Sequence, residues 1–297
     1  MPRVLISDAM DAIAENLLKE SKIAVDVKVN LDQQELINII PNYEGLIVRS
    51  ATKVTKKILD AATNLKIIGR AGAGVDNIDL KTASDKKIVV MNTPGGNTNA
   101  TAEHTLALLF SLIRKIPQAN NGTHNQLWEK KKLKGNELRG KKLGIIGFGN
   151  VGKRFSEMCY GLGLKILIYS KYFNEVKDQH LNYQNANLDF LIKHSDIISL
   201  HCKANANNAP IITMEHLSKM KSNCLIINTA RGNLVDESDL KKALEQNIIK
   251  GAALDVFKVE PATNNELFGL NNLLLTPHIA ASTSEAQIIV AEMVAKQ

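Results

Sequence analysis

The chain of 297 residues contains 44% hydrophobic and 23% charged residues, which is the composition of a folded globular protein. This composition excludes disordered, collagen-like and low-complexity chains. The length exceeds that of one typical domain and predicts two. The longest apolar run, residues 106–113, is far shorter than the ~20 residues that a membrane-spanning helix needs, so we expect no membrane partner.

The formal net charge of +7 is compatible with nucleic acid or with small anionic ligands. Aromatic residues make up only 4% of the chain, and no basic block alternates with them, so we expect no nucleic-acid partner. Arginine is scarce relative to lysine, and its planar guanidinium binds carboxylates and phosphates in a way that lysine cannot reproduce. An arginine inside a motif is therefore a functional candidate.

The cysteines Cys159, Cys202 and Cys224 are odd in number and lack CxxC spacing. They predict neither a disulfide framework nor a metal site. The first residues include acidic side chains where a secretory signal would have a long apolar stretch. The sequence therefore predicts a protein of the reducing cytoplasm.

Short apolar runs alternate with helical segments along the chain, which predicts an α/β fold built from βαβ units with parallel sheets. In the first third we expect strands at residues 4–7, 24–29, 45–48, 66–69 and 88–91. Helices are expected at residues 9–20 and 32–40. A cluster of turn-forming residues at 92–97 then predicts a hinge.

A second α/β unit follows the hinge. We expect a helix at residues 100–114, strands at 142–147, 165–169, 197–201, 224–228 and 251–254, and a helix at 236–246. The last helix, residues 282–296, is expected to pack back on the first unit. We therefore predict two α/β domains with parallel sheets: a discontinuous first domain, residues 1–94 completed by 283–297, and a second domain, residues 95–282.

Residues 147–152 match the pattern GxGxxG between a predicted strand and a predicted helix. The first glycine allows a tight turn, the second lets the backbone approach a pyrophosphate, and the third lets helix and strand pack closely. The motif predicts a dinucleotide site formed by Gly147, Phe148, Gly149, Asn150, Val151 and Gly152. A second glycine-rich segment, residues 71–75, has only two glycines and is the weaker candidate.

The strand at residues 165–169 is followed by Ser170 and Lys171, where NAD-binding domains usually carry an acidic residue for the ribose hydroxyls. A hydroxyl followed by a cation accommodates the 2′-phosphate of NADP, and Lys203 could add a second cation. Alternatively, Ser170 binds the ribose more weakly than a carboxylate and Lys171 points to solvent. We therefore predict NAD as the cofactor, with NADP also accepted.

Three charged candidates follow successive strands of the second unit. Arg231 comes after the strand at 224–228, Glu260 after the strand at 251–254, and His278 after the strand that comes next. The carboxyl ends of parallel strands are where α/β sheets place ligands. Each residue alone would more often be structural, but the set at one edge of a dinucleotide-binding sheet predicts a catalytic site.

With these motifs, the chain resembles the D-isomer-specific 2-hydroxyacid dehydrogenases over nearly its whole length. The resemblance also rests on residues 48–55, 69–77, 91–97, 116–119 and 255–261. It implies two Rossmann-like domains, of which the first, residues 1–94 completed by 283–297, binds substrate and the second, residues 95–282, binds the dinucleotide. It implies that His278 takes the proton from the substrate hydroxyl, that Glu260 tunes its imidazole, and that Arg231 grips the substrate carboxylate.

The same resemblance implies a cofactor contact at Thr229, Ala230 and Asp255. The first two segments are similar to those of family members that oxidise 3-phospho-D-glycerate to 3-phosphohydroxypyruvate, the first committed step toward serine. The residues that this similarity implies for substrate binding are Arg49, Ser50, Arg70, Ala73, Gly74, Asn97 and Lys130. Lys130 would reach the site of a neighbouring subunit in a homodimer, or else be an ordinary surface lysine.

Two other functions stay open at this point. A glyoxylate or hydroxypyruvate reductase of the same family fits the fold, although Arg49 and Arg70 favour a phosphorylated substrate. A non-catalytic dinucleotide sensor, like the corepressors that resemble this family, is disfavoured by intact Arg231, Glu260 and His278. The chain ends where longer relatives continue, so we expect neither C-terminal regulatory domains nor feedback control by serine.

Overall fold

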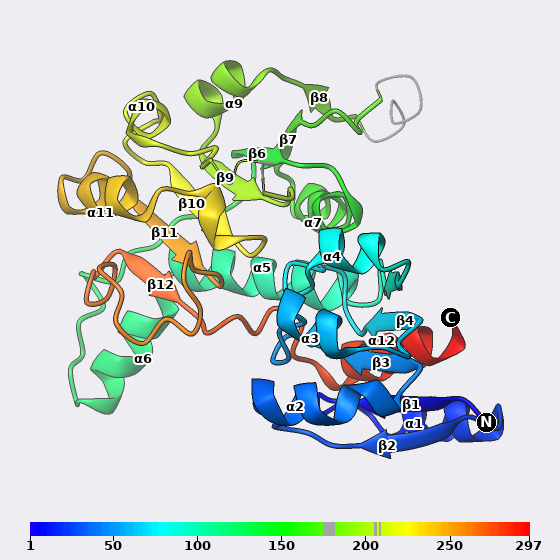
Figure 1. The fold of residues 1–297 in the computed structure, drawn as a ribbon. Helices are drawn as coiled ribbons and strands as arrows, with labels where there is room; N and C mark the ends of the chain where they lie inside the picture. Colours follow the sequence, from blue (N-terminus) through cyan, green and yellow to red (C-terminus); the bar gives the residue numbers. More distant parts are fainter. Residues whose placement is uncertain (175–181, 205–206, 208) are drawn as a thin grey trace. The chain divides into compact units, whose positions relative to one another are not determined.

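The computed structural model describes residues 1–174, 182–204, 207 and 209–297, which divide into two compact units (Figure 1). The first unit consists of Met1–Asn97 and Ser282–Gln297, and the second of Thr98–Ala281. Every strand pair among the described residues is parallel. The prediction of an α/β fold with two parallel sheets is therefore confirmed.

The first unit contains a five-stranded sheet in the order β2-β1-β3-β4-β5. Its strands are β1 (Arg3–Ile6), β2 (Ala24–Val27), β3 (Gly45–Val48), β4 (Ile67–Arg70) and β5 (Val89–Asn92). The helices are α1 (Ile13–Glu20), α2 (Gln33–Ile39), a 3-10 turn η1 (Ile40–Asn42), α3 (Lys56–Ala61) and α4 (Leu80–Asp85). Because neighbouring strand residues point to opposite faces, Leu5, Leu46 and Ile68 share one apolar cluster, whereas Ile6 and Ile47 belong to another.

The C-terminal helix α12 (Ser284–Lys296) completes the first unit, although the whole second unit separates it in sequence. A Cβ atom at Gly69 of β4 would lie 2.6 Å from Val294 of this helix, and one at Gly96 would lie 2.8 Å from Val290. Glycine at these positions lets the helix pack directly on the sheet and on the following turn. The first unit is therefore discontinuous, as predicted.

The second unit contains a seven-stranded sheet in the order β12-β11-β10-β9-β6-β7-β8. Its strands are β6 (Lys142–Ile146), β7 (Lys165–Tyr169), β8 (Gln184–Asn185), β9 (Ile197–Leu200), β10 (Leu225–Asn228), β11 (Gly251–Leu254) and β12 (Leu273–Leu275). The helices include α5 (Thr98–Ile113), α6 (Ile116–His124), α7 (Asn150–Gly161), α9 (Leu188–His194), α10 (Met214–Leu217), η3 (Gly232–Leu234) and α11 (Glu237–Glu245). The sequence predicts β6, β7, β9, β10 and β11 to within one residue at each end, whereas β8 and β12 are too short for a clear periodic pattern.

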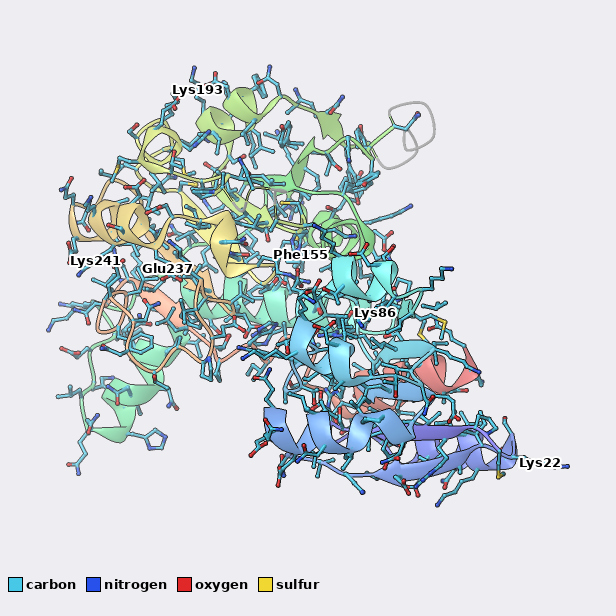
Figure 2. All side chains as sticks on the ribbon, viewed as in Figure 1. Lys22, Lys86, Phe155, Lys193, Glu237 and Lys241 are labelled. Atoms are coloured by element: carbon cyan, nitrogen blue, oxygen red, sulfur yellow. The ribbon has the colours of Figure 1, made fainter. Side chains whose placement is uncertain are left out.

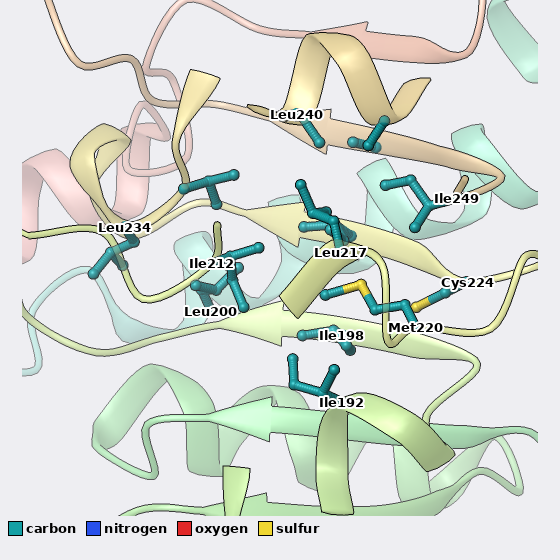
Figure 3. Packing of buried hydrophobic residues seen from close by; sticks show 14 of the residues in the cluster. Ile192, Ile198, Leu200, Ile212, Leu217, Met220, Cys224, Leu234, Leu240 and Ile249 are labelled. Carbon is teal, nitrogen blue, oxygen red and sulfur yellow. The ribbon is translucent and has the colours of Figure 1, made fainter. Parts of the chain in front are cut away.

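The centre of this sheet is covered on both faces. Every residue of β9 and β10 is buried, as expected for strands of a parallel sheet between two helical layers. Figure 3 shows Ile198 and Leu200 of β9 in the apolar cluster, together with Leu240 of α11. The side chain of Phe155 on α7 is fully buried, whereas Lys193 projects away from the ribbon (Figure 2). This packing holds the strand ends that carry the candidate site.

Helix α1 begins at Ile13, later than residue 9, where the sequence predicts its start. Two acidic side chains explain the difference. Asp11 Oδ1 accepts a hydrogen bond from Ile13 N at 3.0 Å, and the carboxylate of Asp8 accepts bonds from Arg49 N and Thr52 N. The bond of Asp11 to a backbone group two residues on favours a helix start over a helix interior, and Asp8 is tied to the loop after β3, so residues 8–12 stay outside the helix.

Candidate active site

The candidate residues of the second unit follow strands that end at the same level. The last residues of six strands are aligned in the parallel register: Ile146, Tyr169, Leu200, Asn228, Leu254 and Leu275. The glycine loop, Ser170, Arg231, Asp255 and His278 all come after these ends. They therefore lie along one edge of the sheet, which is where α/β sheets bind ligands.

The glycine loop has a geometry that suits a dinucleotide. Gly147 has a φ of 100°, and a Cβ there would lie 2.7 Å from Cys202 N. A Cβ at Gly152 would lie 2.1 Å from Gly147 O, so only glycine lets α7 approach the loop. At Gly149, which caps the N-terminus of α7, a Cβ would meet no atom within 4 Å. This open position leaves room for a pyrophosphate at the helix N-terminus.

The other three residues of the loop differ in exposure. Phe148 is buried, and its ring centroid lies 5.2 Å from that of Phe173 in an edge-to-face contact. Its side chain therefore packs in the protein, and only its backbone could contact a cofactor. Asn150 is exposed and Val151 is half-buried.

Ser170 and Lys171 form a tight turn after β7. Ser170 Oγ accepts a hydrogen bond from Tyr172 N at 3.1 Å, and Ser170 O accepts one from Phe173 N at 3.3 Å. The Lys171 ammonium lies 5.1 Å from the centroid of the Tyr172 ring, and Lys203 is exposed. Contact of these side chains with a cofactor ribose stays a prediction.

His278 and Glu260 form a hydrogen-bonded pair. The Nδ1–H group of His278 donates to Glu260 Oε2 at 2.6 Å, and Phe257 N donates to Glu260 Oε1 at 2.9 Å. The bond to Glu260 raises the pKa of His278, although partial burial opposes this effect. Burial raises the pKa of Glu260, but the hydrogen bonds from His278 and Phe257 N outweigh it, so that pKa is lowered. Because Nδ1 is engaged, Nε2 is the nitrogen that can exchange a proton with a substrate.

Arg231 lies within electrostatic reach of this pair. Its positive charge opposes the rise in the pKa of His278. One guanidinium N–H group donates to Ala230 O at 2.7 Å, and Asn228 Nδ2 donates to Arg231 O at 2.8 Å. Thr229 is buried, and its hydroxyl lies 2.8 Å from that of Thr105 on α5. The structure therefore pairs His278 with Glu260 and places Arg231 near enough for its charge to act on His278.

Asp255 is fully buried and holds the segment that carries His278. Its carboxylate accepts hydrogen bonds from Thr276 Oγ1 at 2.6 Å, Ile279 N at 2.9 Å and Ala280 N at 2.8 Å. Burial raises the pKa of Asp255, but these bonds and one from His104 outweigh it and lower the pKa overall. The sequence analysis missed His104, because nothing in its helical context marks it.

The candidate substrate residues of the first unit also share a strand edge. Val48, Arg70 and Asn92, at the ends of three neighbouring strands, are aligned in the parallel register. The remaining candidates, Arg49, Ser50, Ala73, Gly74 and Asn97, come after these ends. Ser50 and Ala73 are exposed, and Arg49, Arg70, Gly74 and Asn97 are half-buried.

Asp8 orders the loop that carries Arg49 and Ser50. Its carboxylate accepts bonds from Arg49 N at 2.5 Å, Thr52 N at 3.1 Å and Thr52 Oγ1 at 2.7 Å. Asn77 Nδ2 donates to both Arg49 O and Thr52 O at 2.7 Å. The guanidinium of Arg49 donates to Ala9 O at 3.0 Å, which uses one of its five N–H groups. Asp8 and Asn77 are thus positioning residues that the sequence analysis did not single out.

The Lys130 side chain is exposed and lies in the segment after α6. Its role in the site of a neighbouring subunit stays a prediction. Among the residues that the structure describes, no group of three His, Cys, Asp or Glu side chains is arranged to hold a metal ion. Nor does any described helix have the length and apolar character needed to cross a membrane.

Comparison with known proteins identifies the family. Residues 106–280 match the family described as D-isomer specific 2-hydroxyacid dehydrogenase, NAD binding domain. The chain belongs to this family, as its motifs predict, and its second unit contains the NAD-binding domain.

Individual relatives agree with this assignment. The chain is 43% identical to a D-3-phosphoglycerate dehydrogenase of Synechocystis sp. over 297 residues, which is 100% of this chain and 53% of that protein. It is 43% identical to a hydroxypyruvate reductase of Thermotoga maritima over 288 residues, 96% of this chain and 93% of that protein. The chain spans about half the length of the first curated relatives that it matches.

A solved structure supports the fold over the whole chain. The NAD⁺-bound 3-phosphoglycerate dehydrogenase of Entamoeba histolytica superposes with a TM-score of 0.84 at 30% identity. The match covers 100% of this chain and 93% of that one. Both predicted Rossmann-like units therefore have counterparts in this solved structure.

Proposed function

We propose that the chain forms the catalytic part of an NAD-dependent dehydrogenase that oxidises 3-phospho-D-glycerate to 3-phosphohydroxypyruvate. The observation that carries the proposal is the hydrogen-bonded His278–Glu260 pair, 2.6 Å apart, at the strand edge that also bears Arg231 and the glycine loop. Similarity to relatives named D-3-phosphoglycerate dehydrogenase, at 43% and 41% identity, supports this substrate.

Three side chains, those of His278, Glu260 and Arg231, would transfer the substrate proton and stabilise the charge that develops on the substrate. NAD, when bound, accepts the hydride from the substrate carbon. Nε2 of His278 takes the proton of the substrate hydroxyl, while Glu260 holds Nδ1–H and stabilises the resulting imidazolium. Arg231 binds the substrate carboxylate and stabilises charge on the oxygen that becomes a carbonyl. In the reverse direction, protonated His278 returns the proton.

Arg49, Ser50 and Arg70 would bind the phosphorylated substrate. Arg49 and Ser50 follow β3, and Arg70 is the last residue of the neighbouring strand β4. Arginine provides the charged, planar donors that phosphate oxygens prefer. Backbone N–H groups at Ala73 and Gly74, and the amide of Asn97, would complete the substrate contacts. Phosphate-directed arginines are the feature that separates this substrate from small unphosphorylated 2-hydroxy acids.

We propose that NAD is used and that NADP is accepted as well, because position 170 is a serine. A carboxylate there would repel the 2′-phosphate of NADP, and Lys171 would attract it. The test compares kcat/KM for NAD and NADP in the native protein and in Ser170→Asp. Ser170→Asp should increase the preference for NAD. If the native protein already rejects NADP as strongly as Ser170→Asp does, this assignment of Ser170 and Lys171 is wrong.

A second candidate function is reduction of hydroxypyruvate or glyoxylate. The observation that favours it is the match to the Thermotoga maritima hydroxypyruvate reductase, which covers 93% of that protein. Steady-state kinetics on phosphorylated and unphosphorylated 2-hydroxy and 2-keto acids distinguish the two. The proposed function requires the highest kcat/KM for 3-phospho-D-glycerate or 3-phosphohydroxypyruvate. Absence of turnover on every acid would instead support a dinucleotide-sensing protein without catalytic activity.

We further propose that the enzyme is a homodimer that serves serine biosynthesis in the cytoplasm. Helix α6 contributes no buried residue, and Ile116, Leu127 and Trp128 in and after it are 52%, 51% and 86% exposed. Exposed apolar side chains gathered in one segment are typical of a protein interface. The cysteines Cys159, Cys202 and Cys224 are unpaired, which fits a reducing compartment. Sedimentation of the native protein and of Trp128→Asp tests the interface.

A further inference from the structure

His104 on α5 contacts the two side chains that hold the segment bearing His278. Its Nε2 atom lies 3.1 Å from Thr276 Oγ1 and 3.4 Å from Asp255 Oδ1. Only 19% of its side chain is exposed, whereas Asp255 is fully buried. These residues all belong to the second unit, and 172 positions separate His104 from Thr276 in sequence.

The hydrogen-bond directions assign the proton on His104. Thr276 Oγ1 donates its single proton to Asp255 Oδ1, at 2.6 Å. A hydroxyl that has given away its proton can only accept from a third group, so His104 must donate through Nε2–H. The result is a chain of donors from His104 through Thr276 to Asp255, and the same carboxylate accepts from Ile279 N and Ala280 N.

The residues that bond to Asp255 flank His278 in sequence and maintain a backbone conformation that is unfavourable by itself. His278 has a φ of 54°, in the left-handed region that side chains other than glycine rarely adopt. Such a conformation persists only when neighbouring contacts determine it. Thr276, Ile279 and Ala280, on both sides of His278, are all tied to Asp255. These bonds therefore hold the backbone on both sides of the His278 ring.

We infer that His104 is a positioning residue for proton transfer, which acts through Thr276 and Asp255 to hold the His278 ring against Glu260. This inference rests on the proposed function of His278 as the group that exchanges the substrate proton. His104 itself touches neither Glu260 nor His278 in any hydrogen bond that the structure describes. It donates a hydrogen bond that keeps the segment 276–280 in one conformation.

Two observables report this positioning. The charged and titratable groups that act on His278 are Glu260, Asp255 and Arg231, and the bond to Glu260 is the largest cause of its raised pKa. A His278 ring that is less well held forms this bond less often, so its pKa should fall toward the ordinary value. Turnover should fall about tenfold or more, because a displacement of ~1 Å at a reacting group can cost on the order of a hundredfold.

The experiment compares variants that keep or remove the donor, each made in the full chain. His104→Leu and Thr276→Val remove links of the network, whereas His104→Gln and Thr276→Ser can preserve them. The measurements are kcat and KM for 3-phosphohydroxypyruvate reduction, and the pKa of the His278 ring by NMR in the absence of substrate. We expect kcat to fall in His104→Leu with little change in KM, the pKa to fall as well, and both to recover in His104→Gln.

Controls separate positioning from a loss of folding. His194 on α9 is also half-buried and contacts Phe190 O through Nδ1 at 2.8 Å, far along the chain from the site. His194→Leu should leave kcat and the His278 pKa unchanged. Because His104 and Thr276 belong to one series of hydrogen bonds, the fold loss of kcat in His104→Leu/Thr276→Val should be smaller than the product of the two single losses.

The outcomes also separate this inference from the proposed function. If the folded native protein turns over none of the acids, the proposed function fails, but the NMR titration still tests whether His104 positions His278. If His104→Leu folds and keeps both the native kcat and the native His278 pKa, the inference is wrong. Equal losses in His104→Gln and His104→Leu would also overturn it, because the donor would then be irrelevant.

Discussion

Asp8 in the first unit and Asp255 in the second hold functional loops by the same set of contacts. Asp8 accepts bonds from Thr52 Oγ1, Thr52 N and Arg49 N, in the loop after the neighbouring strand β3. Asp255 accepts bonds from Thr276 Oγ1, Ile279 N and Ala280 N, in the loop after the neighbouring strand β12. In each case a threonine hydroxyl and two backbone N–H groups fix a loop at the carboxyl edge of a parallel sheet.

The two regions differ in what the loop presents. The loop held by Asp8 carries Arg49 and Ser50, which suit binding of an anion. The loop held by Asp255 carries His278, whose ring has the additional partner Glu260. A buried aspartate that holds a loop can therefore serve either anion binding or proton transfer. Which of the two it serves depends on the side chains that the loop carries. Substitutions in the two regions should therefore affect different kinetic quantities.

The largest effect is expected for His278→Asn. Turnover should fall by ~10² to 10⁴, the usual contribution of a positioned general base. The His278 side chain is 48% exposed, so folding and NAD binding should be preserved. Turnover in the substituted protein is measured together with NAD binding by fluorescence titration. A folded variant with near-native turnover would place the proton transfer elsewhere.

Arg49→Ala should have the next largest effect, on binding rather than on chemistry. Loss of a charged hydrogen bond is worth ~1.5 to 3 kcal/mol, or about ten- to a hundredfold in affinity. The KM for 3-phospho-D-glycerate should rise accordingly, with kcat little changed. An equal loss on phosphorylated and unphosphorylated acids would contradict the assignment of Arg49 to the phosphate.

Asp8→Asn tests whether Asp8 affects substrate binding only by holding the loop that carries Arg49 and Ser50. The amide keeps the shape of the side chain but brings two N–H donors and one acceptor oxygen to a position surrounded by donors. We expect a KM for 3-phospho-D-glycerate raised by about three- to tenfold, since one hydrogen bond is worth ~1 kcal/mol. The pH dependence of kcat should be unchanged. A shifted pH profile in Asp8→Asn would mean that the loop held by Asp8 also affects proton transfer, and the division between the two loops would be wrong.

Glu260→Gln should change the pH profile more than the maximal rate. The bond to Glu260 raises the pKa of His278, so its loss should lower that pKa. Oxidation needs neutral His278, so its acid limb should move to lower pH, and reduction needs protonated His278, so its rate should begin to fall at lower pH. The measurement is kcat/KM against pH in both directions. Coincident profiles for native and Glu260→Gln proteins would leave Glu260 without a tuning role.

The sequence alone predicts the features that depend on near neighbours in the chain. The period of apolar residues predicts the alternation of strands and helices, because a buried face is encoded within each segment. The glycine loop is recognisable because its three glycines lie within six consecutive residues, and Gly147 and Gly152 are needed where the backbone is closely packed. Arg231, Glu260 and His278 each follow one of three successive strands, so the sequence also predicts that they lie near one edge of the sheet.

Only the tertiary structure decides how these residues are held. Thr52 bonds to Asp8 across 44 positions, and His104 contacts Thr276 across 172. Asp8 and His104 carry no local signal, since an aspartate after a strand and a histidine on a helix are common. Their roles depend on which loop the fold brings against them, and hydrogen bonds over such separations follow from strand order and register rather than from any local pattern. The sequence therefore determines which groups can perform the chemistry, and the packing of the sheet determines how they are oriented.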